Sequence, residues 1–194
     1  MKPRPMKTRL ALTAALLLAG CGVNSIPTAE EDVNAKWANV QNDYQRRADL
    51  IGNLVETVKG AAAQERNVLR EVTEARARAT QITLTPEQLT DPEALRNFSR
   101  VQAQLSAPLV TRQLQEAYPE LKTNQNFLTL QSQVEGTENR IAISRRDYNE
   151  AVQAYNTRIR TFPDAIGAKI FYGAKPRVPF EAAPGSERAP TVKF

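Results

Sequence analysis

The chain has 194 residues, a formal charge of +5, a single cysteine and no histidine. Without histidine this chain cannot build a Ser-His-Asp triad, a Cys-His pair, a histidine-containing zinc site or the Glu-x-x-His di-iron centre of ferritin-like bundles. It also lacks a P-loop and a GxGxxG motif, so we expect no cofactor and no enzymatic activity, with only carboxylate chemistry left open.

The first twenty residues resemble a bacterial secretory signal. Lys2, Arg4, Lys7 and Arg9 precede an apolar run from Leu10 to Gly20. Such a run extends about 16 Å as a helix, whereas a bilayer core needs about 20 apolar residues. We therefore expect residues 1–20 to be a cleaved signal peptide rather than a transmembrane anchor.

Cys21 closes the tetrapeptide Leu18-Ala19-Gly20-Cys21, which resembles a lipobox. We expect cleavage between Gly20 and Cys21 and attachment of diacylglycerol and palmitate to Cys21, because a thiolate is a strong nucleophile. Several acyl chains would hold the protein stably on its membrane, on the extracytoplasmic side. Residue 22 is Gly rather than the Asp that resembles an inner-membrane retention signal, so we expect the outer membrane in a double-membraned bacterium.

Cleavage would also remove most of the net charge. The signal carries four of the 26 basic residues and none of the 21 acidic ones, so the charge falls from +5 to +1. The remaining charges are interleaved rather than gathered in one basic stripe. We therefore expect membrane lipid and envelope proteins as partners, and no nucleic acid.

Heptad-spaced apolar residues predict an all-α, antiparallel up-and-down bundle of about four helices over residues 30–163, after a linker at 21–29. Thr28 and Glu31 suggest a capping box at its start. One apolar seam runs from Val33 to Ala79, too long for a single straight helix, and Gly52 is the favoured position for a kink or a reversal.

The second half of the bundle has clearer boundaries. Thr85-Pro86 and Asp91-Pro92 predict helix starts, and the second opens a helix to Tyr118 that Pro108 should kink, with Leu109 among its inward residues. Another seam runs from Phe127 to Phe162. Residues 164–194 predict a short helix over 166–172, packed on the bundle, and an extended proline-rich tail.

Charged residues at seam positions are the candidate functional constellation. They are expected to form a buried ionic layer or, alternatively, to reach water at the edges of the seams. The residues are Arg47, Glu65, Glu138 and Arg145. Glu135 and Glu138 share a helical face and could bind a cation or support acid-base chemistry, against the simpler interpretation that they are solvated or salt-bridged. Trp37, Tyr44, Tyr148 and Tyr155 recur at helical spacing, which favours core packing.

Several segments resemble the LemA family. They are WANV (37–40), YQRRADLI (44–51), NLVETVKG (53–60), EVTEARA (71–77), YPELK (118–122), QVEGTENRIA (133–142), RRDYN (145–149) and RTFP (160–163). The resemblance implies a membrane-anchored bacterial helical bundle without an agreed activity, linked with envelope maintenance. This chain departs from the family in carrying a lipobox where a transmembrane helix is common, Gly52 where Pro is frequent, and Pro108 within a usually unbroken helix.

From these features we expect a non-enzymatic, lipid-tethered protein that binds envelope partners. A structural spacer and a carboxylate-based ion-binding or enzymatic bundle remain the alternatives.

Overall fold

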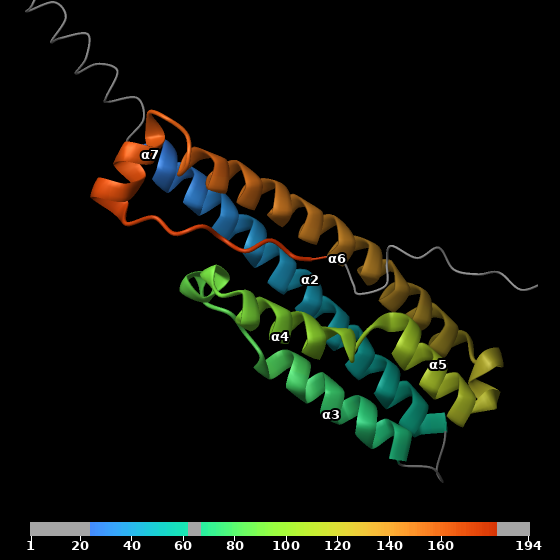
Figure 1. Ribbon diagram of the computed structural model, residues 1–194. Helices are drawn as coiled ribbons and strands as arrows, with labels where there is room; N and C mark the ends of the chain where they lie inside the picture. Colours follow the sequence, from blue (N-terminus) through green and yellow to red (C-terminus); the bar gives the residue numbers. More distant parts are fainter. Residues whose placement is uncertain (1–23, 62–66, 182–194) are drawn as a thin grey trace, which may run out of the picture.

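The computed structural model describes residues 24–61 and 67–181, and in these ranges the chain is helical without a strand (Figure 1). The expected antiparallel bundle is confirmed. Two long helices, α2 (Ser25–Ala61) and α6 (Gln125–Arg158), run side by side in opposite directions as its spine. With 37 and 34 residues they extend about 55 and 51 Å.

Shorter helices cover one side of this spine. They are α3 (Asn67–Gln81), the 3₁₀ turn η1 (Pro86–Thr90), α4 (Pro92–Ala103), α5 (Ala107–Ala117) and the 3₁₀ turn η2 (Pro119–Thr123). After α6 follow α7 (Asp164–Gly167) and the π-helical turn η3 (Ala168–Tyr172). None of the described helices is both long and apolar enough to cross a bilayer.

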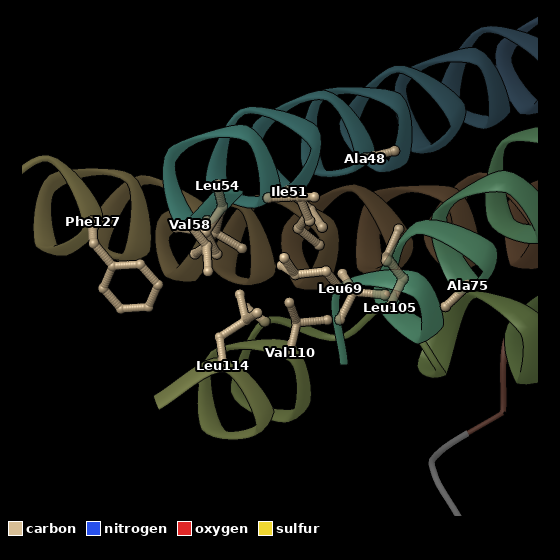
Figure 2. Packing of buried hydrophobic residues seen from close by; sticks show 14 of the residues in the cluster. Ala48, Ile51, Leu54, Val58, Leu69, Ala75, Leu105, Val110, Leu114 and Phe127 are labelled. Atoms are coloured by element: carbon tan, nitrogen blue, oxygen red, sulfur yellow. The ribbon is translucent and has the colours of Figure 1, made fainter. Parts of the chain in front are cut away.

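The buried apolar side chains form two cores along the spine. The core at the α5 end joins the second half of α2 to α3, α5 and the start of α6, with Ile51, Leu69 and Leu114 among its members (Figure 2). The core at the α7 end joins the first half of α2 to η1, α4 and the second half of α6. Each half of α2 and α6 therefore has its own set of partners.

The expectation of a reversal at Gly52 was wrong. Helix α2 passes through Gly52 and ends at Ala61, and α3 begins at Asn67. A Cβ at Gly52 would lie 3.0 Å from Nε of Arg76, and that Nε donates to the carbonyl of Ala48 at 2.8 Å. The glycine thus leaves room for an arginine of α3 to reach the backbone of α2.

The helix start also differs from the expectation. Helix α2 begins at Ser25, so Thr28 is already helical and its hydroxyl donates to the carbonyl of Asn24 at 2.8 Å instead of capping an end. Ile26 is fully buried. Burial of this early residue explains why the helix extends upstream of the predicted residue 30.

The proline signals had mixed outcomes. Thr85 forms a capping box with Gln88, and the Asp91 side chain accepts from the Glu93 amide, as expected. Pro108 does more than kink a helix: α4 ends at Ala103, and Pro108 lies in the first turn of a new helix, where its missing N–H costs little.

The break before α5 changes which residues face inward. Val110 is buried and Leu109 is 42% exposed, so the expectation that Leu109 faces the core was wrong. The predicted seam on α6 holds as far as Tyr155, but Phe162 lies beyond the helix end and is 83% exposed. Both errors arose because the heptad spacing was extended past the end of a helix, where the helical period no longer applies.

Candidate functional site

Arg47 and Glu138 form an ion pair in the middle of the bundle. Arg47, on α2, is 2% exposed, and its Nη1 lies 3.0 Å from Oε1 of Glu138 on α6. Its Nη2 donates to both the carbonyl and the side-chain oxygen of Gln102, at 2.7 and 3.0 Å. The guanidinium also lies 5.0 Å from the centre of the Tyr44 ring.

This ion pair joins the two helix ends at the α4–α5 break. Gln102 lies in the last turn of α4, so Arg47 places a positive charge where the α4 carbonyls point. Oε1 of Glu138 accepts from the Ala107 amide at 2.7 Å, which places a negative charge at the first turn of α5. Both charges compensate unsatisfied backbone groups, so the pair organises the connection between helices.

Of the other two predicted members of the ionic layer, Arg145 forms no ion pair with Glu138 among the described residues. Nη2 of Arg145 donates to the carbonyl of Glu181 at 3.1 Å, and its guanidinium lies 4.5 Å from the centre of the Phe180 ring. Glu65 lies outside the described residues. Among the described residues the layer is the Arg47–Glu138 pair, with the Gln102 carbonyl and the Ala107 amide as backbone partners.

The alternative carboxylate site does not assemble around Glu135 and Glu138. Glu135 is exposed and accepts from the side chain of Gln131 at 2.9 Å, while Glu138 is held by Arg47 and Ala107. Within residues 24–61 and 67–181, no three His, Cys, Asp or Glu side chains are grouped so that they could hold a metal ion.

The four aromatic residues predicted for the core are all buried. Trp37 packs against the rings of Phe98 and Tyr148 at centroid distances of 5.2 and 5.5 Å, and its indole N–H donates to the carbonyl of Leu84 at 3.2 Å. Burial raises the pKa of Tyr44, Tyr148 and Tyr155, with the nearby arginines acting in the opposite direction. These hydroxyls remain protonated through the physiological range.

The sequence did not predict that the C-terminal segment enters the core. Gly173 takes the left-handed conformation (φ 54°), which ends η3, and residues 174–181 (the strap) then run back along α6. In Figure 1 the strap is the orange-red line crossing the bundle from the α7 end. Phe180 of the strap is 6% exposed and stacks on Trp37 at 5.9 Å.

Two asparagines of α6 bind the strap backbone. Asn156 both donates to the Arg177 carbonyl and accepts from its amide, at 2.8 Å each. Asn149 pairs in the same way with Phe180, at 3.0 and 2.8 Å. Seven residues of helix and three extended residues both cover about 10 Å, so the spacing of the asparagines matches the strap. That spacing is the signal from which the contact could have been predicted.

Arg177 is the second buried cation, and sequence reasoning did not single it out. Its guanidinium binds Glu30 on α2 and the carbonyl of Pro86 in η1, and lies 6.0 Å from the centre of the Tyr155 ring. Nε of Arg177 finds no hydrogen-bond partner within residues 24–61 and 67–181. Through Arg177 the strap joins the start of α2 to η1.

A family model described as LemA family matches residues 36–194. The chain belongs to the LemA family. Two curated relatives are Magnetosome protein MamQ 1 and Magnetosome protein MamQ 2 of Paramagnetospirillum magneticum (strain ATCC 700264 / AMB-1). Each is 28% identical over 177 residues, covering 79% of this chain and 62% of the relative. The chain thus spans about three fifths of the length of the curated relatives it matches.

In this LemA-family bundle the strap also forms one wall of a groove of about 450 Å³ against α4. Its lining includes the apolar side chains Leu95, Val178 and Phe180 and the charged residues Arg96, Arg100, Arg145 and Glu181. The groove thus combines apolar surface with three arginines and one acid. Cys21 and the predicted signal peptide lie outside the described residues of this LemA protein.

Proposed function

We propose that this LemA protein is a lipid-tethered, non-enzymatic scaffold of the bacterial envelope that binds other envelope proteins. The observation that carries the proposal is the position of Cys21 relative to the bundle. Cys21 follows a short apolar run, and helix α2 begins only four positions later, at Ser25. A lipid on Cys21 would therefore attach almost directly to a helix that is packed along the core.

The groove between α4 and the strap supports protein binding. Its apolar lining could take a hydrophobic side chain, and Arg96 and Arg100 could pair with acidic residues that flank it. Both arginines are exposed. The ion pair of buried Arg47 and half-buried Glu138 supports a structural role instead, since both side chains bind helix ends. We accordingly favour a partner protein over a substrate.

Replacement of Cys21 tests the tether. We expect Cys21→Ser to remain an unprocessed precursor that takes up no label from a palmitate analogue, because a hydroxyl is a much weaker nucleophile than a thiolate. Ser25→Ala, four positions away, is the matched control and should be labelled like the parent. Undiminished label on Cys21→Ser would contradict the proposal. Density-gradient fractionation would test the outer-membrane location, and sedimentation with inner-membrane markers would refute it.

Crosslinking in intact membranes tests partner binding. The double variant Arg96→Glu/Arg100→Glu reverses the charge of the groove, and we expect it to lose crosslinked proteins that the parent captures. Arg112→Glu, on the exposed surface of α5, is the control and should capture them normally. Identical crosslinks in all three proteins would exclude the groove, and no crosslinks in any of them would favour a structural spacer.

A further inference from the structure

The α7 end of the bundle carries a cluster of exposed apolar side chains, here called the end patch. Its members come from the turn after α6, from α7 and from η3: Phe162, Ile166, Ile170 and Phe171 are 83, 53, 68 and 68% exposed. The sequence had predicted that Phe162 belonged to a seam and that the helix over 166–172 packed on the bundle. Of the residues in α7 and η3, only Ala168 is buried. The short helices thus form, but they present their large side chains to the outside.

The end patch lies beside the start of α2. The hydroxyl of Ser25 donates to Asp164 at 2.7 Å, and Arg158 at the end of α6 reaches the carbonyl of Ser25 at 3.5 Å. Gly167 approaches Ile26, since a Cβ placed on it would lie 3.8 Å from Ile26 Cδ1. Figure 1 shows α7 and the beginning of α2 at the same end of the molecule. The segment that carries the end patch is therefore attached to the first turn of α2.

The charges around the end patch are mostly basic. Residues 158–175 contain four exposed basic residues, Arg158, Arg160, Lys169 and Lys175, and one acid, Asp164, which is bonded to Ser25. Exposed acids on α2 begin at Glu31, about 9 Å further along the helix from Ser25. Large exposed apolar side chains with basic residues close by in the same segment are what an anionic lipid surface binds.

The chain upstream of Ser25 supplies the argument for this occupant. Cys21 precedes Ser25 by four positions, and four extended residues cover at most about 14 Å. If Cys21 is lipidated, the end patch cannot be far from the bilayer surface. A second copy of the chain could cover the same side chains, but the basic residues of this segment would then face the same positive charges on the other copy.

We infer that the end patch docks on the anionic lipid surface to which the chain is tethered, so that the bundle stands end-on from the membrane. This inference rests on the tether proposed above. The tether alone would leave the bundle free to swing, whereas docking fixes the α5 end and η2 away from the bilayer. The proposed binding groove would then be held at a set height above the lipid.

Tryptophan quenching by brominated lipid tests the docking. The full chain, purified from membranes in detergent, would be reconstituted into vesicles of phosphatidylethanolamine and phosphatidylglycerol with brominated acyl chains. We expect Phe171→Trp to shift its emission to shorter wavelength and lose intensity. Leu109→Trp, 42% exposed on α5, is the control and should show neither effect. Trp37 is present in all variants, so its emission is measured in the parent protein and subtracted. Ile170→Trp provides a second reporter from the same patch.

Flotation of the same vesicles separates this inference from the tether. If the protein floats and Phe171→Trp is unquenched, docking is refuted and the tether stands. If the protein does not float, the tether fails, and quenching in excess vesicles still decides whether the patch binds lipid. Equal quenching of both reporters would mean that the bundle lies flat, which refutes end-on docking. A blue shift without vesicles that grows with protein concentration would assign the patch to a second copy.

Discussion

The ion pair between Arg47 and Glu138 should be strongly coupled energetically. The Arg47 side chain is 3% exposed and that of Glu138 is 31% exposed. Arg47→Met removes the charge and leaves two oxygens of Gln102 without this donor, so we expect a loss of roughly 3–5 kcal/mol in the free energy of unfolding. Glu138→Gln keeps an acceptor for the Ala107 amide but leaves the Arg47 charge uncompensated, at a cost of about 2–3 kcal/mol.

The double variant measures the interaction itself. Because the second change removes a group whose partner is already gone, Arg47→Met/Glu138→Gln should cost less than the sum of the single changes by about 1–3 kcal/mol. Arg112 and Glu116 provide a matched control pair at 2.8 Å, with side chains 78 and 64% exposed. Their double-mutant cycle should show no measurable coupling.

Urea unfolding followed by tryptophan fluorescence is a suitable assay. Trp37 is the only tryptophan and is 3% exposed, so its emission should report loss of the core at the α7 end. Additive single effects below about 1 kcal/mol each would refute the reasoning, because they would mean that both charges are effectively solvated.

Three further perturbations test other contacts. Gly136→Ala, which has open space at the new Cβ, should raise the free energy of unfolding by about 0.5–1 kcal/mol. Gly52→Ala should raise it by about 1 kcal/mol less, because the new Cβ would press against the Arg76 side chain. That difference should vanish in an Arg76→Ala background; if thermal unfolding shows it unchanged, the contact with Arg76 is not the cause. Asn149→Ala should speed hydrogen exchange at the strap amide to which it is bonded, and unchanged protection would argue against the paired hydrogen bonds. Burial raises the pKa of the three buried tyrosines, so the unfolded chain loses these protons first. The contribution of these tyrosines to the stability of the folded state is therefore fully present below about pH 10. It is lost as the pH rises further. Between about pH 8 and pH 11 the melting temperature should fall by less in Tyr148→Phe than in the parent, each protein being compared with its own value at pH 8. Equal falls would contradict the conclusion that Tyr148 contributes to this pH dependence.

The periodic part of the fold was predictable from the sequence. The heptad spacing on α2 and α6 identified both spine helices and placed Trp37 and Tyr148 in the core, because burial along a helix follows its period. Arg47 and Glu138 were found as seam charges for the same reason. Each deviated from the apolar pattern at a position that had to face inward.

The errors arose where burial depends on contacts between distant segments. Gly52 suggests a break when only helix propensity is considered, but its role is set by Arg76, a residue of another helix. Arg177 lies in a proline-rich segment without periodicity, and its burial depends on Glu30, 147 positions away. Arg145 follows the α6 seam but contacts the strap. No pattern within one helix carries this information.

The strap also constrains the order in which the fold can be completed. Phe180 and Arg177 close the core at the α7 end around Trp37 and Glu30, so residues near opposite ends of the chain must meet. Among the described residues, the core at the α5 end has no buried member beyond Val134, so it can form before the strap packs. Until the strap packs, the apolar face on the first half of α2 stays exposed. Contacts of such long sequence separation are slow to form, so folding should finish at the α7 end, after the core at the α5 end has formed.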